Sequence, residues 1–338
     1  MLREVRVHDA VGLRLAHDLT QIIPGQFKGR LFRKGHVIAE EDIPALLSIG
    51  KEHIYVLELE PGELHEDDAA LRMAEAVRGG RLDMTEPSEG KVVLKAAIQG
   101  LARVDEQLIH AVNDLDEVAM ATIRDLTVVE PGQPVVGTRV IPLVVAESRI
   151  AEVERLAGEA RRLAAAEGRT GPVEVLPFRP MRAGVITTGS EVYSGRIEDR
   201  FGPVVRAKLE RFGSTVAEQR FVSDRSDDIV REIRYFREAG VDLILVTGGM
   251  SVDPDDRTPG AIRQAGARVV SHGTPMLPGS MLMMAYLDDV PIMGLPGSVM
   301  HDPYTVFDVL LPRVLAGVPV SRSDIRRLGY GGLHSTRG

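Results

Sequence analysis

The stretch from Val241 to Gly260 constrains the fold of this chain more than any other. It begins with the apolar run LILV at residues 243–246, whose length and branched side chains are typical of a strand buried on both faces. The run ends at Gly248 and Gly249, which tolerate positive φ and let the backbone approach a ligand without an intervening Cβ. Three aspartates follow, and then Thr258-Pro259, a pair suited to the first turn of a helix. This order of elements is typical of a ligand site at the carboxyl edge of an open α/β sheet.

The same stretch also has a purely structural interpretation. A glycine pair followed by aspartates often serves only to connect a strand to a helix, and Asp255 could act as the helix cap. Short motifs of this kind also occur by chance. The neighbouring segments therefore have to distinguish a ligand site from a simple connection.

Strand and helix patterns alternate regularly from residue 183 to residue 317. The helical segments repeat apolar residues at every third or fourth position, as in Val205, Leu209 and Phe212. Helices that alternate with buried strands predict a mainly parallel sheet that is covered on both faces. The expected strands lie at 183–189, 214–222, 243–248, 267–271, 280–287 and 290–297, and the expected helices at 201–213, 226–240, 258–266 and 305–317.

Three glycine-containing loops follow strands of this predicted sheet. They are TTGSE at 187–191, TGGMSVDPDD at 247–256 and GLPGS at 294–298. Because the carboxyl ends of parallel strands lie at one edge of a sheet, we expect the three loops to converge. Their convergence favours a ligand site, although the turn at 294–297 could also serve tight packing alone.

Two of these loops offer groups suited to an anionic or heterocyclic ligand. The amides and hydroxyls of Thr188, Gly189 and Ser190 could bind a phosphate or the polar edge of a flat ring. The amides of Gly248 and Gly249 could cradle a phosphate.

The acidic loop and the last loop would complete the site. Asp255 and Asp256 carry like charges side by side, and a nearby Mg²⁺ would keep both carboxylates ionised. The segment Pro296-Gly297-Ser298 would close the floor of the pocket. A dinucleotide dehydrogenase is disfavoured, because no G-x-G-x-x-G motif follows the first strand of the α/β region.

The length of 338 residues suggests about two domains, at roughly 150 residues each. We expect a mixed α+β accessory domain over 1–146, a helix and linker over 147–180, the α/β domain over 181–320 and a C-terminal tail over 321–338. The helix at 147–168 could connect the domains, contact a partner helix or pack in a core.

Within the accessory domain the patterns are less regular. Residues 1–60 indicate short strands and turns with a helix at 40–50, and residues 126–145 indicate further strands. Residues 66–126 are expected to be mostly helical. That expectation rests on an apolar stripe of Leu94, Ile98, Leu101, Leu108 and Val112.

Composition excludes several classes of protein. The absence of cysteine removes disulfides, thiolate metal sites and cysteine catalysis. The absence of tryptophan, a 4% aromatic content and a net charge of −8 argue against a nucleic-acid surface. Neither a signal peptide nor a run long enough to span a membrane is apparent, so we expect a cytoplasmic protein.

The motifs TTGSE, TGGMSVDPDDRTP and GLPGS, in this order and spacing, resemble the molybdopterin-binding domain of molybdopterin adenylyltransferases and molybdopterin molybdotransferases. The resemblance covers about residues 180–317 and implies a three-layer α/β/α fold. It also implies that the pterin binds along the strand edge and that Asp256, supported by Asp255, acts in catalysis and in Mg²⁺ binding. The residues that match the ligand-contacting loops are Thr188, Gly189, Ser190, Glu191, Gly248, Gly249, Ser251, Pro296, Gly297 and Ser298.

The resemblance implies an enzyme of molybdenum cofactor biosynthesis that forms a homo-oligomer. Its reaction would be either adenylyl transfer from ATP to molybdopterin or Mg²⁺-dependent insertion of molybdate into adenylylated molybdopterin. Two alternatives stay open, namely a non-catalytic carrier or sensor of molybdopterin and a related Mg²⁺-dependent nucleotide diphosphate hydrolase.

The chain also departs from the molybdotransferase pattern. More weakly, residues 10–20 and 134–145 resemble the accessory portion of those enzymes, but the short Asp-Gly-Tyr-type signature is absent. Leu277 and Ser280 stand where molybdotransferases usually have lysines, and Gly297-Ser298-Val299 replaces their Gly-Asn-Pro. Those lysines would supply positive charge for molybdate or for the terminal phosphate, so their absence favours the carrier alternative.

Overall fold

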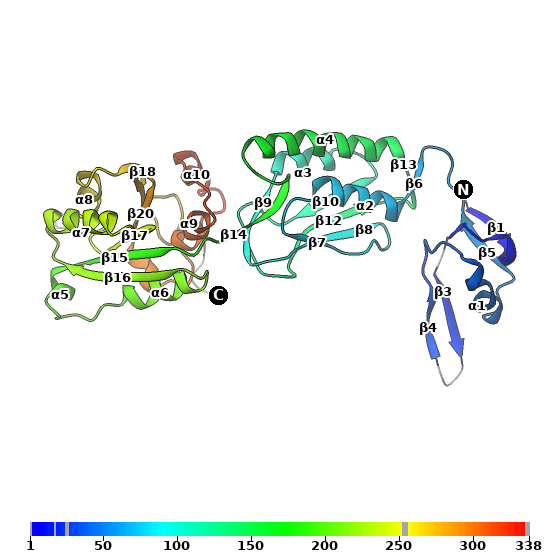
Figure 1. Ribbon diagram of the computed structural model, residues 1–338, viewed down its shortest axis with the longest axis horizontal. Coiled ribbons are helices and arrows are strands. Elements are labelled where there is room, and N and C mark those ends of the chain that lie inside the picture. Colours follow the sequence, from blue (N-terminus) through cyan, green and yellow to red (C-terminus); the bar gives the residue numbers. More distant parts are fainter. Residues whose placement is uncertain (1, 17, 24–26, 252–255, 335–338) are drawn as a thin grey trace. The chain divides into compact units, whose positions relative to one another are not determined.

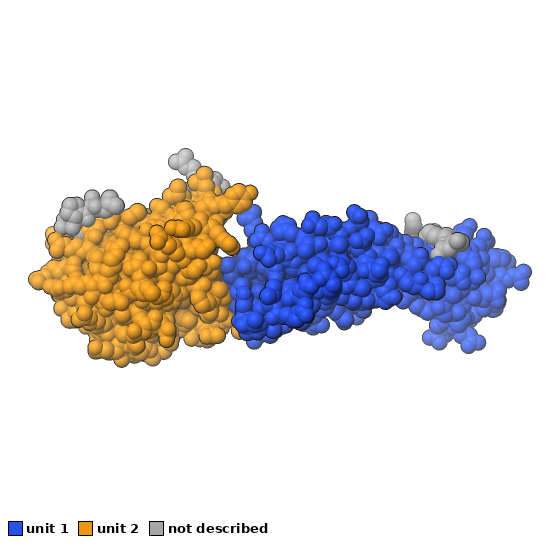
Figure 2. All heavy atoms as spheres, turned by 90° about the horizontal axis from the view of Figure 1, so that it is seen from above, with its two compact units in different colours: residues 1–176 blue, residues 177–338 orange. Residues whose placement is uncertain are grey.

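The computed structural model describes residues 2–16, 18–23, 27–251 and 256–334. The chain forms two compact units, residues 1–176 and residues 177–338, which are coloured separately in Figure 2. No helix in the described part of the chain is both long and apolar enough to span a membrane.

The second unit is built on a six-stranded sheet (Figure 1). Its four strands β16, β15, β17 and β20 run parallel, and β19 and β18 continue the sheet in antiparallel pairing. The prediction of a mainly parallel sheet is therefore confirmed. In sheet order, the strands are β16 (Thr215–Val222), β15 (Arg182–Thr188), β17 (Leu243–Thr247), β20 (Val290–Leu295), β19 (Met283–Leu287) and β18 (Arg268–His272).

Helices cover both faces of this sheet. Helices α7 (Ser226–Glu238) and α8 (Thr258–Gln264) bury Ile233, Phe236 and Ile262 against one face. Helix α6 (Phe201–Glu210) also packs on β15 and β16, and the buried residues of α6 and of α9 (Val306–Leu315) lie outside the core cluster formed by α7 and α8. Because residues along a strand alternate between faces, the fully buried strand β17 contributes to both layers of core. The unit is a three-layer α/β/α fold, as the sequence predicts.

Four shorter elements complete the second unit. They are α5 (Ser190–Tyr193), the 3-10 turn η3 (Gly297–Met300), α10 (Arg322–Arg327) and the last residue of β14 (Val173–Pro177), because the boundary between the units falls within that strand.

The first unit combines antiparallel sheets with helices, which confirms the expected mixed α+β domain. Its strands pair in the orders β1-β5-β2, β3-β4, β13-β6, β10-β12-β8-β7 and β11-β9-β14. The elements before residue 66 are β1 (Leu2–Arg6), η1 (Val7–Asp9), β2 (Arg14–Leu15), β3 (Leu19–Ile23), β4 (Phe27–Phe32), η2 (Glu40–Asp42), α1 (Ile43–Ser48), β5 (His53–Leu57) and β6 (Glu63–His65). The later elements are α2 (Glu66–Val77), β7 (Leu82–Met84), β8 (Lys91–Ala96), β9 (Gly100–Val104), α3 (Glu106–Asn113), β10 (Val118–Thr122), β11 (Val128–Val129), β12 (Pro134–Val140), β13 (Val144–Ala146), α4 (Glu147–Ala166) and β14.

The expectation that residues 66–126 are mostly helical is wrong. Only α2 and α3 are helical there, and the segment between them forms β7, β8 and β9. In β8 the buried residues alternate with more exposed ones, which is the period of two expected for a strand. The strand pairs with β12, and its buried residues form one face of the sheet. The apparent helical stripe joins Leu94 and Leu101, which lie on different strands, to Leu108 on α3.

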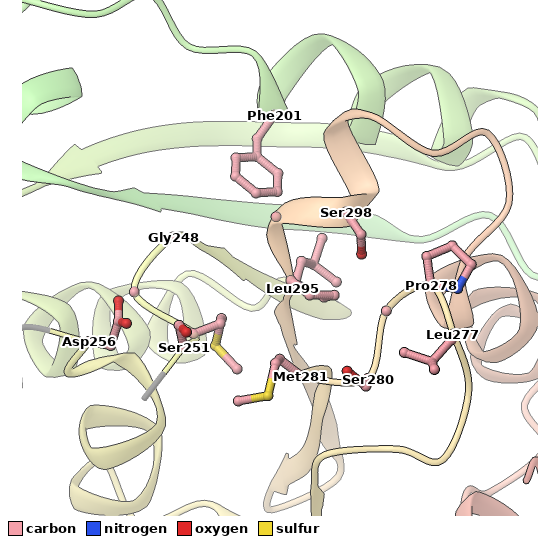
Figure 3. A pocket seen from close by; sticks show the side chains of 15 residues that line it. Phe201, Gly248, Ser251, Asp256, Leu277, Pro278, Ser280, Met281, Leu295 and Ser298 are labelled. Atoms are coloured by element: carbon pink, nitrogen blue, oxygen red, sulfur yellow. The ribbon is translucent and has the colours of Figure 1, made fainter. Parts of the chain in front are cut away.

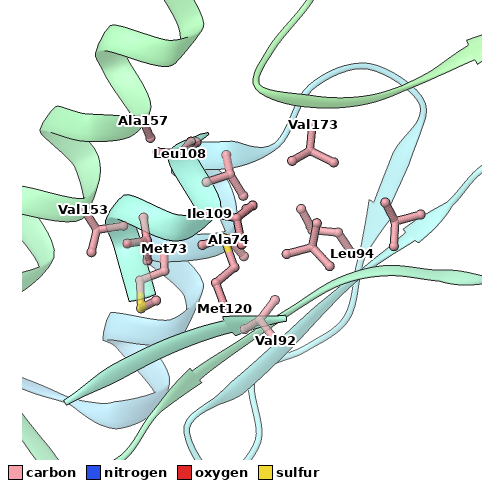
Figure 4. Close-up of a cluster of buried hydrophobic side chains, with 14 of the residues drawn as sticks. Met73, Ala74, Val92, Leu94, Leu108, Ile109, Met120, Val153, Ala157 and Val173 are labelled. Atoms are coloured by element: carbon pink, nitrogen blue, oxygen red, sulfur yellow. The ribbon is translucent and has the colours of Figure 1, made fainter. Parts of the chain in front are cut away.

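Helix α4 packs in the core of the first unit. Figure 4 shows Val153 and Ala157 of this helix near Met73 of α2 and Leu108 of α3, with the strand residue Val92 below them. Of the three roles considered for the helix at 147–168, core packing is the one that the structure shows.

Candidate functional site

The three loops named from the sequence lie at one edge of the sheet. Strands β15, β17 and β20 are neighbours, and their carboxyl ends lie side by side, with Thr187 opposite Thr247 and Thr247 opposite Leu295. The segments 187–191, 247–251 and 294–298 therefore leave adjacent strands side by side. The predicted convergence is confirmed.

The backbone conformation of the turn requires glycine at positions 248 and 249. Both glycines have positive φ, +88° and +57°. A Cβ on Gly248 would lie 2.5 Å from the carbonyl oxygen of Thr188, and one on Gly249 would lie 2.9 Å from Oγ1 of Thr258. The Thr258 hydroxyl also donates to the Gly248 carbonyl oxygen at 2.8 Å. The glycine pair thus serves the packing of the loops whether or not a ligand binds there.

Two adjoining pockets open at this edge. The first, which we call the apolar pocket, has a volume of about 510 Å³, and Asp256 is the single charged residue in its described lining. In Figure 3 it extends from Asp256 to Leu277 and Pro278, with Leu295 between them. Its lining consists of Phe201, Gly248, Gly249, Met250, Ser251, Asp256, Leu277, Pro278, Gly279, Ser280, Met281, Leu295, Pro296, Gly297 and Ser298.

The second, the polar pocket, has a volume of about 690 Å³. It shares Gly249 and Asp256 with the apolar pocket, so a single ligand could occupy both. Its lining consists of Thr188, Gly189, Ser190, Glu191, Val192, Asp224, Arg225, Gly249, Asp256 and Arg257.

These linings contain every described residue that the sequence assigns to the site. Thr188, Gly189, Ser190 and Glu191 line the polar pocket, and the remaining ones line the apolar pocket or both. Asp255 lies outside the described residues.

Two hydroxyl groups in these pockets lack a hydrogen-bond partner among the described residues. They are Oγ1 of Thr188 and Oγ of Ser298, and both atoms are buried. The Thr188 side chain is only 4% exposed, and its hydroxyl lies beneath the glycine turn. Leaving a buried hydroxyl unpaired costs about 1–3 kcal/mol. A polar atom of a ligand could remove this cost for Thr188 if the glycine turn shifts to expose the hydroxyl.

Asp224 is a site residue that sequence reasoning missed. Its Oδ2 accepts hydrogen bonds from the backbone N–H of Ser190 at 2.8 Å and from the Ser190 hydroxyl at 2.9 Å. The sequence did contain a signal for Asp224, because this residue follows β16. β16 is the fourth parallel strand, and its carboxyl end lies at the same edge of the sheet. Arg225 and Arg257 were missed as well, and they bring positive charge to the polar pocket.

The described residues alone do not form a metal centre. No group of three or more histidine, aspartate or glutamate side chains in the described ranges is arranged to hold a metal ion. Asp256, which lines both pockets, could supply one ligand to Mg²⁺, and phosphate oxygens would have to supply others.

Similarity to curated proteins covers only part of the chain. A "CinA-like protein" of Mycobacterium tuberculosis is 42% identical over 77 residues, which is 23% of this chain and 18% of the relative. The corresponding protein of Mycobacterium leprae is 40% identical over 77 residues, again 18% of the relative. The chain thus spans less than a fifth of the length of these curated relatives.

Similarity to solved structures also covers only part of the chain. The molybdopterin biosynthesis enzyme MoaB of Thermus thermophilus has 23% identity and a TM-score of 0.33, covering 41% of this chain and 98% of that one. The tungsten cofactor synthesizing protein MoaB of Pyrococcus furiosus has 21% identity and a TM-score of 0.32, covering 40% and 91%.

Two family models match the chain. Residues 4–58 match a domain of unknown function. Residues 184–316 match the family described as "Probable molybdopterin binding domain", and this range contains all three glycine loops. The α/β/α fold, the loops at one strand edge and this match agree with the resemblance drawn from the motifs, and residues 184–316 of the chain are similar to the family of probable molybdopterin-binding domains.

Proposed function

We propose that this protein binds molybdopterin, free or adenylylated, across the polar and apolar pockets and acts enzymatically in molybdenum cofactor biosynthesis. The observation that carries the proposal is the pair of adjoining pockets, which share Gly249 and Asp256. Their lining includes Thr188 and Ser298, whose buried hydroxyls have no hydrogen-bond partner among the described residues. The match of residues 184–316 to the probable molybdopterin-binding domain family supports a pterin as the ligand.

Either of two reactions would take place at the shared boundary of the pockets. In adenylyl transfer, a phosphate oxygen of molybdopterin attacks the α-phosphorus of ATP and pyrophosphate leaves. In molybdate insertion, the phosphoanhydride bond of adenylylated molybdopterin is hydrolysed, AMP leaves and the dithiolene sulfurs bind molybdate. Both reactions develop charge on phosphate oxygens, which Mg²⁺ would neutralise when bound.

The residues of the chain would have separate tasks in these reactions. Asp256 lies where the pockets meet and would hold or orient the cation. The amides of Gly248 and Gly249 would bind phosphate oxygens, and the Thr188 hydroxyl would orient the ligand. The Ser190 hydroxyl already donates to Asp224, so its role would be to shape the loop after β15.

A non-catalytic carrier is the second candidate. It is favoured by the described lining of the apolar pocket, which contains no lysine or arginine to hold molybdate or a terminal phosphate. A carrier would bind molybdopterin without converting it.

The test combines calorimetric binding of molybdopterin and of its adenylylated form, with and without Mg²⁺, with product analysis in the presence of ATP or molybdate. We expect binding by the wild-type protein, and we expect Asp256→Asn to bind the pterin while turnover falls at least about tenfold. Asp289→Asn is the matched control, since Asp289 is exposed in the turn between β19 and β20.

The possible results separate the candidates. Binding without turnover would identify a carrier. Full turnover by Asp256→Asn would remove this residue from the mechanism, and no binding of either pterin would refute the proposed function.

A further inference from the structure

The segment from Gly329 to His334, which we call the C-terminal strap, lies against the loop that forms one wall of the apolar pocket. The backbone N–H of Leu277 donates to the carbonyl oxygen of Gly332 at 2.8 Å. The N–H of His334 in turn donates to the carbonyl oxygen of Leu277 at 2.8 Å. Both backbone polar groups of a pocket-lining residue are therefore bonded to the strap.

Close packing fixes the strap in this position. A Cβ on Gly332 would overlap the carbonyl oxygen of Leu328 and lie 2.8 Å from that of Pro275, so only glycine fits. The ring of His334 also contacts the ring of Tyr304, with centroids 5.0 Å apart at an interplanar angle of 65°.

The rest of the wall is held by other segments. Thr274 donates to the carbonyl oxygen of Ser280 at 2.8 Å, and Val306 donates to that of Pro278 at 3.3 Å. These bonds hold the two sides of the loop, whereas Leu277 lies between them with its side chain 51% exposed. The strap is thus the element that hydrogen-bonds to the backbone of Leu277.

We infer that the strap positions the wall at residues 277–281 and thereby sets how tightly the apolar pocket holds its ligand. This inference rests on the proposed function, because it takes molybdopterin as the ligand. It extends the site to Gly332 and His334, which lie outside the range that matches the molybdopterin-binding family. Because coupling is reciprocal, ligand binding must also stabilise the strap.

The test uses full-length Gly332→Ala, whose methyl group would push the strap away from Pro275 and Leu328. We expect faster hydrogen exchange of the Leu277 amide and molybdopterin affinity about tenfold lower, the effect of losing one or two hydrogen bonds. Tyr330→Ala is the matched control in the same segment, because the Tyr330 side chain is 96% exposed. A chain ending at Leu328 provides a second variant if Gly332→Ala folds poorly.

A readout in the wild-type protein distinguishes positioning from mere structural support. Addition of molybdopterin should slow exchange of the Leu277 and His334 amides, which no purely structural role requires. Wild-type affinity in both strap variants, or exchange that the ligand leaves unchanged, would overturn this inference alone. A wild-type protein that binds no pterin would refute the proposed function and the inference that rests on it.

Discussion

The backbone N–H and the hydroxyl of Ser190 both donate to Oδ2 of Asp224, at 2.8 and 2.9 Å. This pair of hydrogen bonds ties the loop after β15 to the loop after β16 at the mouth of the polar pocket. The carboxylate of Asp224, in the loop after the neighbouring strand β16, therefore helps to shape the first loop of the site.

Removal of the Asp224 carboxylate should loosen this loop. We expect Asp224→Ala to raise the exchange rate of the Ser190 amide and to lower molybdopterin affinity several-fold, because two hydrogen bonds that order the pocket are lost. Asp227→Ala, at an exposed position in the first turn of α7, is the control and should bind like the wild type. Unchanged molybdopterin affinity in Asp224→Ala would show that the hydrogen bonds between Asp224 and Ser190 do not shape the site.

Replacement of Thr188 tests whether its hydroxyl, which has no hydrogen-bond partner in the described part of the chain, serves a ligand. Thr188→Val keeps the shape of the side chain, so the free energy of unfolding should stay unchanged or rise by up to about 1 kcal/mol while molybdopterin affinity falls. Thr247→Val is the contrast, since the Thr247 hydroxyl donates to Oγ1 of Thr187 at 3.2 Å and its loss should cost about 1 kcal/mol. Denaturant unfolding and calorimetry measure the two effects. Wild-type affinity in Thr188→Val would argue against a ligand contact.

Two glycines of the apolar pocket should respond differently to alanine. Gly248→Ala should lower the free energy of unfolding by about 1–3 kcal/mol, because φ is +88° and the new Cβ would lie 2.5 Å from the Thr188 carbonyl oxygen. Gly297→Ala meets no atom within 4 Å, so its stability should match the wild type. Equal stabilities of the two variants, measured by denaturant unfolding, would contradict this account of the turn.

The stability of the first unit should decrease in mild acid because of His65. This side chain is 1% exposed, and its Nδ1 accepts the N–H of Asp67 at 3.2 Å. Burial lowers the pKa of His65 below its ordinary value of 6.5. The unfolded chain therefore takes up the proton first, so the stabilisation is complete above about pH 6.5 and is lost as the pH falls from there through the folded pKa.

Melting temperatures between pH 7.5 and pH 5.5 measure this effect. His65→Gln should flatten the decline over this range, because the titrating group is gone. His53→Gln, at an exposed position on β5, should keep the wild-type profile. If the melting temperature of His65→Gln fell by the same amount over this pH range, the loss of stability would come from other titrating groups.

Local sequence was enough to predict the strands and turns of the second unit. The run at 243–246 is apolar at every position and rich in branched side chains, which is typical of a strand covered on both faces, and β17 is buried throughout. Helix positions followed in the same way from the repeat of Ile229, Ile233 and Phe236, which are all buried on α7. Parallel order then brings the three glycine loops to one edge.

The tertiary structure decided which segments pair and which distant residues meet, because a local sequence pattern does not encode these contacts. Pairing with β12 made a strand of β8, where the wider apolar spacing had suggested a helix. Contacts between distant segments likewise brought Asp224 to Ser190 and the strap to Leu277. A periodic pattern records which face of an element is apolar, whereas such hydrogen bonds depend on which elements become neighbours. The sequence by itself thus determined the strands, the glycine turns and the edge where a ligand can bind, and the packing of distant segments decided which side chains and which backbone groups meet there.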